Sequence, residues 1–156
     1  MSLHQFKTFQ FLPISNKRAW DFFSSAKNLS VITPPEMDFN ILTQNLPEEI
    51  YEGMKIDYTV KPLLGIKMKW QTEISKVDQN FSFTDRQLIG PYKTWIHTHT
   101  FYPQKGGILM KDVVDYELPL GNLGNIMHWL IVRNKIENIF VFRKLALEKL
   151  FKNDID

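Results

Sequence analysis

Cysteine is absent from the 156 residues of this chain. Disulfide bonds, thiolate metal sites and a cysteine nucleophile are therefore excluded. Glycine is scarce as well, with 7 residues. The sequence holds neither a glycine-rich phosphate loop nor the nucleophile elbow of the α/β-hydrolases. No short catalytic motif identifies an enzyme class.

An excess of one charge is also missing, because 19 basic and 17 acidic residues give a formal net charge of +2. This balance does not indicate a nucleic-acid partner. No run reaches the roughly 18 apolar residues of a membrane span, so we expect none. Residues 1–7 lack the long apolar core of a signal peptide. We therefore expect a cytoplasmic protein.

Aromatic residues are abundant: they make up 13% of the chain, with 12 Phe and 4 Trp, within a hydrophobic content of 44%. A chain of this length and apolar content is typical of one folded domain that buries a sizeable core. We expect a single domain over residues 1–156.

The order of elements follows from hydrophobic periodicity and from the positions of Pro and Gly. Alternation with period two predicts strands at 6–12, 37–41, 56–60, 66–74, 81–89, 94–102 and 108–118. Helical patterns occupy 17–25, where Ser15 can cap the first turn, 28–32, and 123–151. Short loops between successive strands predict antiparallel hairpins.

These elements predict an α+β fold, in which a curved seven-stranded antiparallel sheet wraps around a long C-terminal helix. Two short helices lie between the first and second strands. A sheet with one apolar face must cover that face, and only the terminal helix is long enough to do so. This arrangement leaves a hollow between sheet and helix unless large side chains fill it.

The terminal helix carries an irregular apolar stripe. Leu123, Ile126 and Leu130 share one face, whereas the apolar residues after Arg133-Asn134 lie on roughly the opposite face. One interpretation is a kink or a helix buried on two sides. The other is that the first two turns form a lid over the mouth of a cavity.

Four ionisable side chains are predicted on the inner face of the sheet: Asp85, His97, His99 and Asp112. Directly opposed residues of a hairpin share a face, so Asp112 falls opposite His99 or His97, and Asp85 near His97. Three interpretations remain open. The cluster is structural, or it anchors the polar group of a ligand, or it serves catalysis or metal binding through the His-x-His pair.

Several short motifs resemble the SRPBCC ligand-binding proteins, which belong to the START and birch-pollen-allergen-like helix-grip superfamily. The resemblance covers nearly the whole chain and is most specific, to a small bacterial branch, from Gly90 to Pro119. One departure is Gly107, where a Gly-Thr pair would open the last strand. The matching residues are Asn28-Leu29, Ile32-Thr33-Pro34-Pro35, Gly90-Pro91-Tyr92, Trp95, His97, His99, Phe101, Met110, Asp112, Val114, Tyr116, Leu118-Pro119, Gly121, Leu123-Gly124, Ile139-Phe140 and Arg143.

The resemblance implies a helix-grip fold with a cavity that holds lipids, sterols, polyketides or similar molecules. Our leading hypothesis is non-catalytic binding or carriage of such a small apolar molecule in a cavity of several hundred Å³. The alternatives are a cyclase or dehydratase that uses a His–Asp pair, and a protein-interaction module without a ligand. A weak homodimer also stays open. We expect no cofactor and assert no metal.

The predicted ligand-binding residues come from the inner faces of the strands and from the start of the terminal helix. The catalytic candidates among them are His97, His99, Asp112 and Asp85. The full set is Trp70, Phe83, Asp85, Gln87, Trp95, His97, His99, Phe101, Met110, Asp112, Tyr116, Met127 and Leu130.

Overall fold

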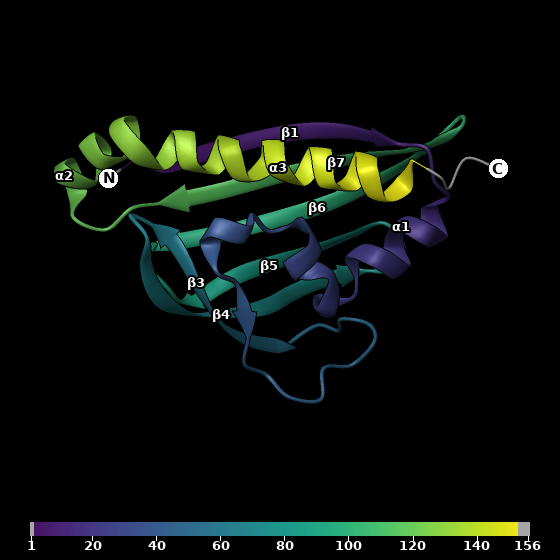
Figure 1. Cartoon of the computed structure of the whole chain (residues 1–156), viewed down its shortest axis with the longest axis horizontal. Coiled ribbons are helices and arrows are strands. Elements are labelled where there is room, and N and C mark those ends of the chain that lie inside the picture. The colour runs from purple at the N-terminus through teal and green to yellow at the C-terminus, as the bar shows by residue number, and fades with distance from the viewer. Residues whose placement is uncertain (1, 153–156) are drawn as a thin grey trace.

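The computed structural model of the chain describes residues 2–152. Seven antiparallel strands form one sheet in the order β1-β7-β6-β5-β4-β3-β2 (Figure 1). Every neighbouring pair except β1–β7 joins strands that are consecutive in the sequence. The strands are β1 (His4–Leu12), β2 (Asn40–Ile41), β3 (Lys55–Leu63), β4 (Ile66–Asp78), β5 (Ser82–Ile89), β6 (Thr94–Gln104) and β7 (Gly107–Glu117).

The helical segments cover one face of this sheet. Helix α3 runs along β1 and β7 (Figure 1). Helix α1 lies near the C-terminal end of α3, and the short turns that follow α1 lie beside the middle of α3. The segments are α1 (Asn16–Phe23), η1 (Ala26–Ile32), η2 (Pro35–Met37), α2 (Gly121–Met127), η3 (His128–Val132) and α3 (Arg133–Phe151). The predicted architecture, with two short helices between the first two long strands and a long terminal helix, is confirmed.

Helix α1 begins where the sequence predicts it. The Ser15 hydroxyl accepts a hydrogen bond from the Arg18 amide at 3.1 Å, which satisfies one of the free donors of the first turn. The helix buries four residues against the sheet, namely Ala19, Trp20, Phe22 and Phe23.

The strand predicted at 37–41 is shorter than expected. Pro34 and Pro35 start a 3-10 turn that includes Met37, and Asp38 adopts a left-handed conformation with φ 47°. Proline cannot donate to a strand ladder, so extended pairing starts only after this turn. Of the predicted segment 37–41, only Asn40 and Ile41, which form β2, pair with β3.

The hairpin between β6 and β7 depends on two glycines. Gly106 has φ +83°, a left-handed conformation that glycine adopts without strain. A Cβ on Gly107 would lie 2.2 Å from the Leu12 carbonyl oxygen at the end of β1. Glycine at the start of β7 thus allows β1 to approach closely.

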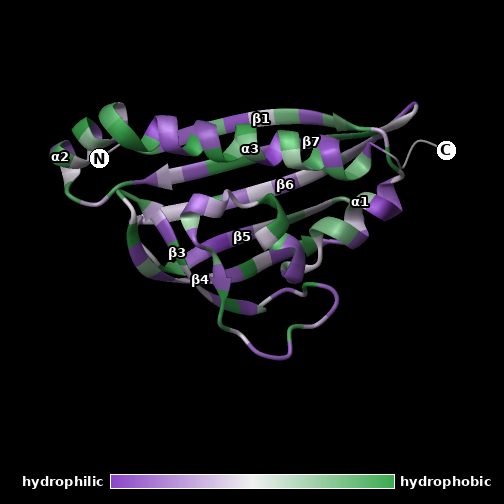
Figure 2. Cartoon of the chain, in the orientation of Figure 1, coloured by the Kyte–Doolittle hydropathy of each residue, from purple (hydrophilic) through white to green (hydrophobic). Residues whose placement is uncertain are grey.

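The irregular stripe of the terminal helix coincides with a π-helical turn, η3, between α2 and α3. Each π turn contains one extra residue and so rotates the following side chains by about 100°. Trp129 and Leu130 are exposed before the end of this turn, whereas Ile136 and Phe140 are buried after it. The colouring in Figure 2 shows apolar residues along α2 as well as along α3. In the described part of the chain, no helix combines the length and hydropathy needed to cross a bilayer.

Candidate functional site

A pocket lies between the concave face of the sheet, the middle of α3 and the segment from η1 to β2. Its cavity volume is about 160 Å³, below the several hundred Å³ that the sequence analysis predicted. The reason is the size of the side chains that enter it. Trp70, Tyr92, Trp95, Phe39 and Tyr58 all line the pocket and occupy much of the hollow.

These aromatic rings form one continuous wall. Trp70 meets Trp95 edge to face at 5.6 Å between ring centroids and lies parallel to Tyr58 at 6.0 Å. Phe39 packs against Tyr58 at 4.8 Å. Edge-to-face and offset contacts of this kind fix the ring orientations. The apolar side of the pocket is therefore preformed.

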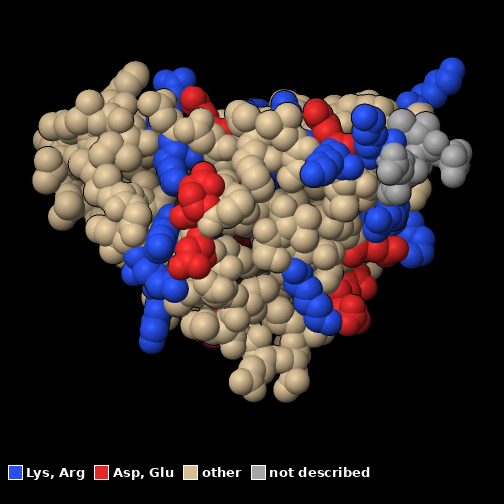
Figure 3. All heavy atoms as spheres, viewed as in Figure 1, with Lys and Arg blue, Asp and Glu red and all other residues tan. Residues whose placement is uncertain are grey.

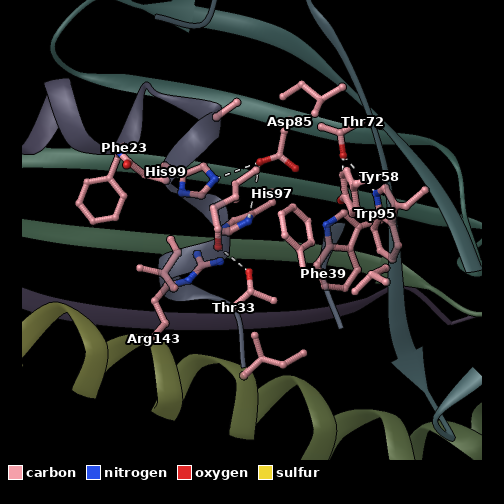
Figure 4. Close-up of a pocket in the computed structure, with 18 of the residues that line it drawn as sticks. Phe23, Thr33, Phe39, Tyr58, Thr72, Asp85, Trp95, His97, His99 and Arg143 are labelled. Atoms are coloured by element: carbon pink, nitrogen blue, oxygen red, sulfur yellow. Dashed lines mark hydrogen bonds and ion pairs between the residues drawn. The ribbon is translucent and has the colours of Figure 1, made fainter. Parts of the chain in front are cut away.

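One hydroxyl pair interrupts the aromatic wall. The Tyr58 hydroxyl lies 3.2 Å from Thr72 Oγ1, which also accepts a hydrogen bond from Trp70 Nε1 at 3.1 Å. Burial raises the pKa of Tyr58 well above its ordinary value, so the phenol stays protonated. This side of the pocket offers neutral hydrogen-bonding groups (Figure 4).

A charged cluster forms the opposite side. In the sheet register Asp85 of β5 stands opposite His97 of β6, and His99 stands opposite Asp112 of β7. The hydrogen bonds run diagonally instead, from His97 Nε2 to Asp112 Oδ1 at 2.7 Å and from His99 Nε2 to Asp85 Oδ2 at 3.0 Å. The structure thus brings the four predicted polar residues together, and Figure 4 shows three of them, Asp85, His97 and His99.

Each imidazole lies between the two carboxylates. The second nitrogen of each ring faces the other carboxylate: His97 Nδ1 is 3.8 Å from Asp85 Oδ2, and His99 Nδ1 is 3.1 Å from Asp112 Oδ1. The two rings are 3.7 Å apart between centroids. Asp112 lies on the far side of the histidines from the pocket, which Asp85, His97 and His99 line.

Arg143 of α3 completes the cluster. Its guanidinium lies over the Phe140 ring at 4.8 Å, and its Nη1 is 3.8 Å from Asp112 Oδ1. The side chain is buried, and its Nε and Nη1 atoms have no hydrogen-bond partner. Burial lowers the pKa of Arg143 against the attraction of the two carboxylates. An arginine nevertheless remains charged in proteins.

The two carboxylates are held ionised. Burial alone would raise the pKa of Asp112, but hydrogen bonds from His97 and His99 outweigh that effect and hold its pKa well below the ordinary value. Burial opposes ionisation of Asp85 in the same way, and its hydrogen bond with His99 and the nearby positive charges lower its pKa.

The two histidines differ in their ionisation. Burial lowers the pKa of His97, and the charge on His99 adds to that effect. For His99, burial is outweighed by its contacts with Asp112 and Asp85, so its pKa is raised. The pair therefore holds a proton preferentially on His99.

Six of the residues predicted from the sequence line the pocket: Trp70, Phe83, Asp85, Trp95, His97 and His99. The other seven do not. Phe101 and Met110 are fully buried in the core, and Asp112 lies behind the histidines.

The remaining four of these residues also have identified positions. Gln87 exchanges hydrogen bonds with the backbone of Tyr92, and the Tyr116 hydroxyl lies 2.8 Å from His128 Nε2. Met127 ends α2, and Leu130 is 68% exposed. In the described part of the chain, no residue from 121 to 132 lines the pocket.

Arg143 is the main residue that the sequence interpretation did not place at the site. Arg143 is among the residues that carry the family resemblance, but the sequence assigns it no place in the ligand-binding set. The spacing of Ile136, Phe140, Arg143 and Leu147 was the available signal, because residues three and four apart share a helix face. Tyr58 carried a similar signal in its alternation with Ile56 and Val60.

Comparison with known proteins gives structural matches only. No protein-family model matches this chain, and no curated protein matches it either. Protein Ms6760 from Mycobacterium smegmatis matches with a TM-score of 0.68 and 15% identity, over 95% of this chain and 90% of its own. TTHA0849 from Thermus thermophilus matches with a TM-score of 0.65 and 18% identity, over 94% of this chain and 95% of its own.

A norcoclaurine synthase point mutant from Thalictrum, solved in complex with a transition-state analogue, has the same fold. Its TM-score is 0.65 at 16% identity, over 95% of this chain and 96% of that one. Identities this low establish shared architecture and not shared activity. The helix-grip fold expected from the resemblance to the START and birch-pollen-allergen-like superfamily is thereby confirmed for this chain.

Proposed function

We propose that this protein binds a small, largely apolar molecule in the pocket between the sheet and α3. The observation that carries the proposal is the composition of the lining. Aromatic and aliphatic side chains form most of it, and one side carries a compact set of charged groups. Concave, mainly apolar sites with few convergent polar groups are typical of small-molecule binding.

The unpaired donors of Arg143 indicate the polar part of the ligand. A buried donor without an acceptor costs about 1–3 kcal/mol, and more when the group is charged. Nε and Nη1 of Arg143, a residue that lines the pocket, are two such donors, and Nη1 has only an ion pair at 3.8 Å with Asp112. A ligand oxygen that accepts from them would remove this cost. The expected ligand therefore combines an apolar body with at least one acceptor oxygen.

The cavity volume limits the size of the ligand's apolar part. An engineered apolar cavity of about 150 Å³ holds benzene, and the pocket here has about 160 Å³. A single substituted ring fits without rearrangement. A lipid, sterol or polyketide would need the side chains of the η1–η2 segment to move outward, since this segment forms the wall that is not part of the sheet or of α3.

Displacement of an environment-sensitive fluorophore tests the proposal. Delipidated protein should shift the emission of the dye, and acetophenone or a fatty acid should displace it. Ile139→Trp, which adds bulk to the pocket lining, should weaken dye binding at least about tenfold. Leu145→Trp lies on the exposed side of the same helix and should change nothing. No displacement by any apolar competitor, or equal effects of the two variants, would contradict ligand binding here.

An enzyme of the cyclase or dehydratase kind is the second candidate, favoured by the His99–Asp85 contact on the pocket wall. A histidine held by a carboxylate can transfer protons to and from a bound substrate. Replacing His97 by Ala should then abolish turnover while ligand binding survives. If the wild type shows no turnover and the replacement abolishes ligand binding, the result would instead favour a carrier.

A further inference from the structure

The ring nitrogens and carboxylate oxygens of the charged cluster converge on one point at the pocket wall. Asp85, His97 and His99 each offer one potential ligand atom, and the three atoms lie within 4.8 Å of one another. Asp85 Oδ2 is 3.0 Å from His99 Nε2 and 3.8 Å from His97 Nδ1. A metal ion about 2.0–2.2 Å from each donor atom holds those atoms about 3.0–3.6 Å apart. The two separations from Asp85 lie close to this range, while the distance between the two histidine nitrogens, within 4.8 Å, would shorten when a metal binds.

Asp112 occupies the position of an orienting group. The ring nitrogens that face away from this point are His97 Nε2 and His99 Nδ1, which lie 2.7 and 3.1 Å from Asp112 Oδ1. Histidines that bind metals typically direct their other nitrogen at a carboxylate or carbonyl, which fixes the ring and raises its basicity. Asp112 makes that hydrogen bond with His97, and it lies within ion-pair distance of the His99 ring.

Charge also favours a cation at this point. The two carboxylates and the Arg143 guanidinium carry a formal net charge of −1. A metal ion would take the place of the proton between His99 Nε2 and Asp85 Oδ2, since metal binding releases protons from its ligands.

We propose that Asp85, His97 and His99 bind a divalent transition-metal ion, with Asp112 orienting both imidazoles. Two imidazoles and one carboxylate suit Zn(II), Fe(II), Co(II) or Ni(II) and leave coordination positions open. Those positions face the pocket, because all three residues line it. The ion would thus lie beside the Arg143 donors. The proposal is independent of the ligand proposed above, since the aromatic wall remains without the metal.

The chain contains its own control pair. His4 and His128 stack at 3.6 Å between centroids, a separation close to that of His97 and His99. The polar contact of His128 is with the Tyr116 hydroxyl instead of a carboxylate. Adventitious binding of a metal to neighbouring histidines would therefore affect both pairs.

The experiment is titration of the chelator-treated full chain with Zn(II), followed by calorimetry, and with Co(II), followed by visible absorption. We expect one equivalent to bind, with a Co(II) spectrum of nitrogen and oxygen ligands. Asp85→Asn and His99→Gln should each weaken binding at least about 100-fold, and Asp112→Asn about 10–100-fold. His4→Gln should leave affinity unchanged, and circular dichroism identifies any variant that fails to fold.

Three results would overturn the metal site. The folded wild type binds no stoichiometric Zn(II) or Co(II), or Asp85→Asn binds as tightly as the wild type, or His4→Gln alone abolishes binding. The first result needs no variant and so does not depend on folding of the mutants. Fluorophore displacement by an apolar competitor would still test the ligand proposal separately.

Discussion

Two parts of the interior sit on the same face of the same strands and differ in what fills them. Where α1 and the end of α3 cover the β6–β7 hairpin, Phe101, Ile108, Met110 and Leu147 are 0% exposed and packed without a pocket. Farther along the same strands, the inner positions change to His99, His97 and Trp95 on β6, and to Asp112, Val114 and Tyr116 on β7.

The difference follows from the covering elements. Helix α1 brings Trp20 and Phe23 onto Phe101, with ring centroids at 6.0 and 5.4 Å. Helix α1 ends at Phe23. Beyond it, α3 brings Phe140 against His97 and Arg143 toward Asp112. One end of the interior is thus specified by packing and the other by charge pairing. Mutations should therefore affect stability most at the first end and binding most at the second.

The largest expected effect is on the packed end. Phe101→Ala should lower the free energy of unfolding by about 3–5 kcal/mol, because it opens a cavity in a well-packed core. Phe39→Ala, on the pocket wall, should cost only about 1–2 kcal/mol, since Phe39 already borders an open space. Urea denaturation measures both. Equal losses would mean that the pocket end is as tightly packed as the core.

A smaller loss of stability is expected at the charged end. Asp112→Asn keeps the shape but removes the charge that both histidines contact, and it should cost about 1–3 kcal/mol. Asp115→Asn is the matched control, because Asp115 accepts from Gln5 in an exposed contact on the other face of β7. Its effect should stay within about 0.5 kcal/mol. A similar cost for both variants would contradict the role of Asp112 as the centre of the cluster.

Arg143→Met tests whether Arg143 binds the ligand. Methionine keeps the apolar packing against Phe140 but removes the positive charge beside Asp112, so the free energy of unfolding should fall by about 1–3 kcal/mol. Ligands with an acceptor oxygen should lose about 10–100-fold in affinity, as expected for one charged hydrogen bond. Calorimetry that compares the affinity for acetophenone with the affinity for ethylbenzene tests this prediction. Arg133→Met removes an exposed pair with Glu137 and a contact with the exposed Trp129 ring, both outside the pocket lining, and should alter neither quantity. An unchanged preference for acetophenone would show that Arg143 does not bind the acceptor.

The smallest effect on stability is expected outside both regions. Trp129 and Leu130 are 70% and 68% exposed, at the end of the molecule where Figure 3 shows a broad area without charged residues. Replacing both by Ser should change unfolding by less than about 0.5 kcal/mol and should reduce any weak homodimer, measured by sedimentation at rising concentration. Strong destabilisation would show that these residues belong to the packed interior.

The sequence predicted the fold because its signals are local. Period-two alternation, the breaks at Gly90-Pro91 and Gly106-Gly107, and the Ser15 cap depend on neighbouring residues alone. The same alternation predicted Asp85 near His97 and Asp112 opposite His99 or His97, and the register places Asp112 opposite His99. These features need no knowledge of how the helix meets the sheet.

The parts of the site that were not predicted depend on how α3 packs against the sheet. The spacing of Arg143 with Ile136 and Phe140 indicates a shared buried face, but it does not show that this face of α3 meets the charged cluster of the sheet. The small cavity volume depends on the rotamers of Trp70 and its aromatic neighbours. The placement of Met127 and Leu130 outside the pocket lining has the same origin. To predict where such residues lie, one must know how elements distant in the sequence pack together.

Native mass spectrometry of the purified chain, followed by denaturing extraction, tests the central claim most directly. Our account predicts a bound small molecule at one per chain, with an apolar body and an acceptor oxygen, that is lost in the Ile139→Trp variant and retained in Leu145→Trp. A wild-type mass equal to that of the bare chain, which stays unchanged after incubation with apolar competitors, would contradict a ligand-binding pocket.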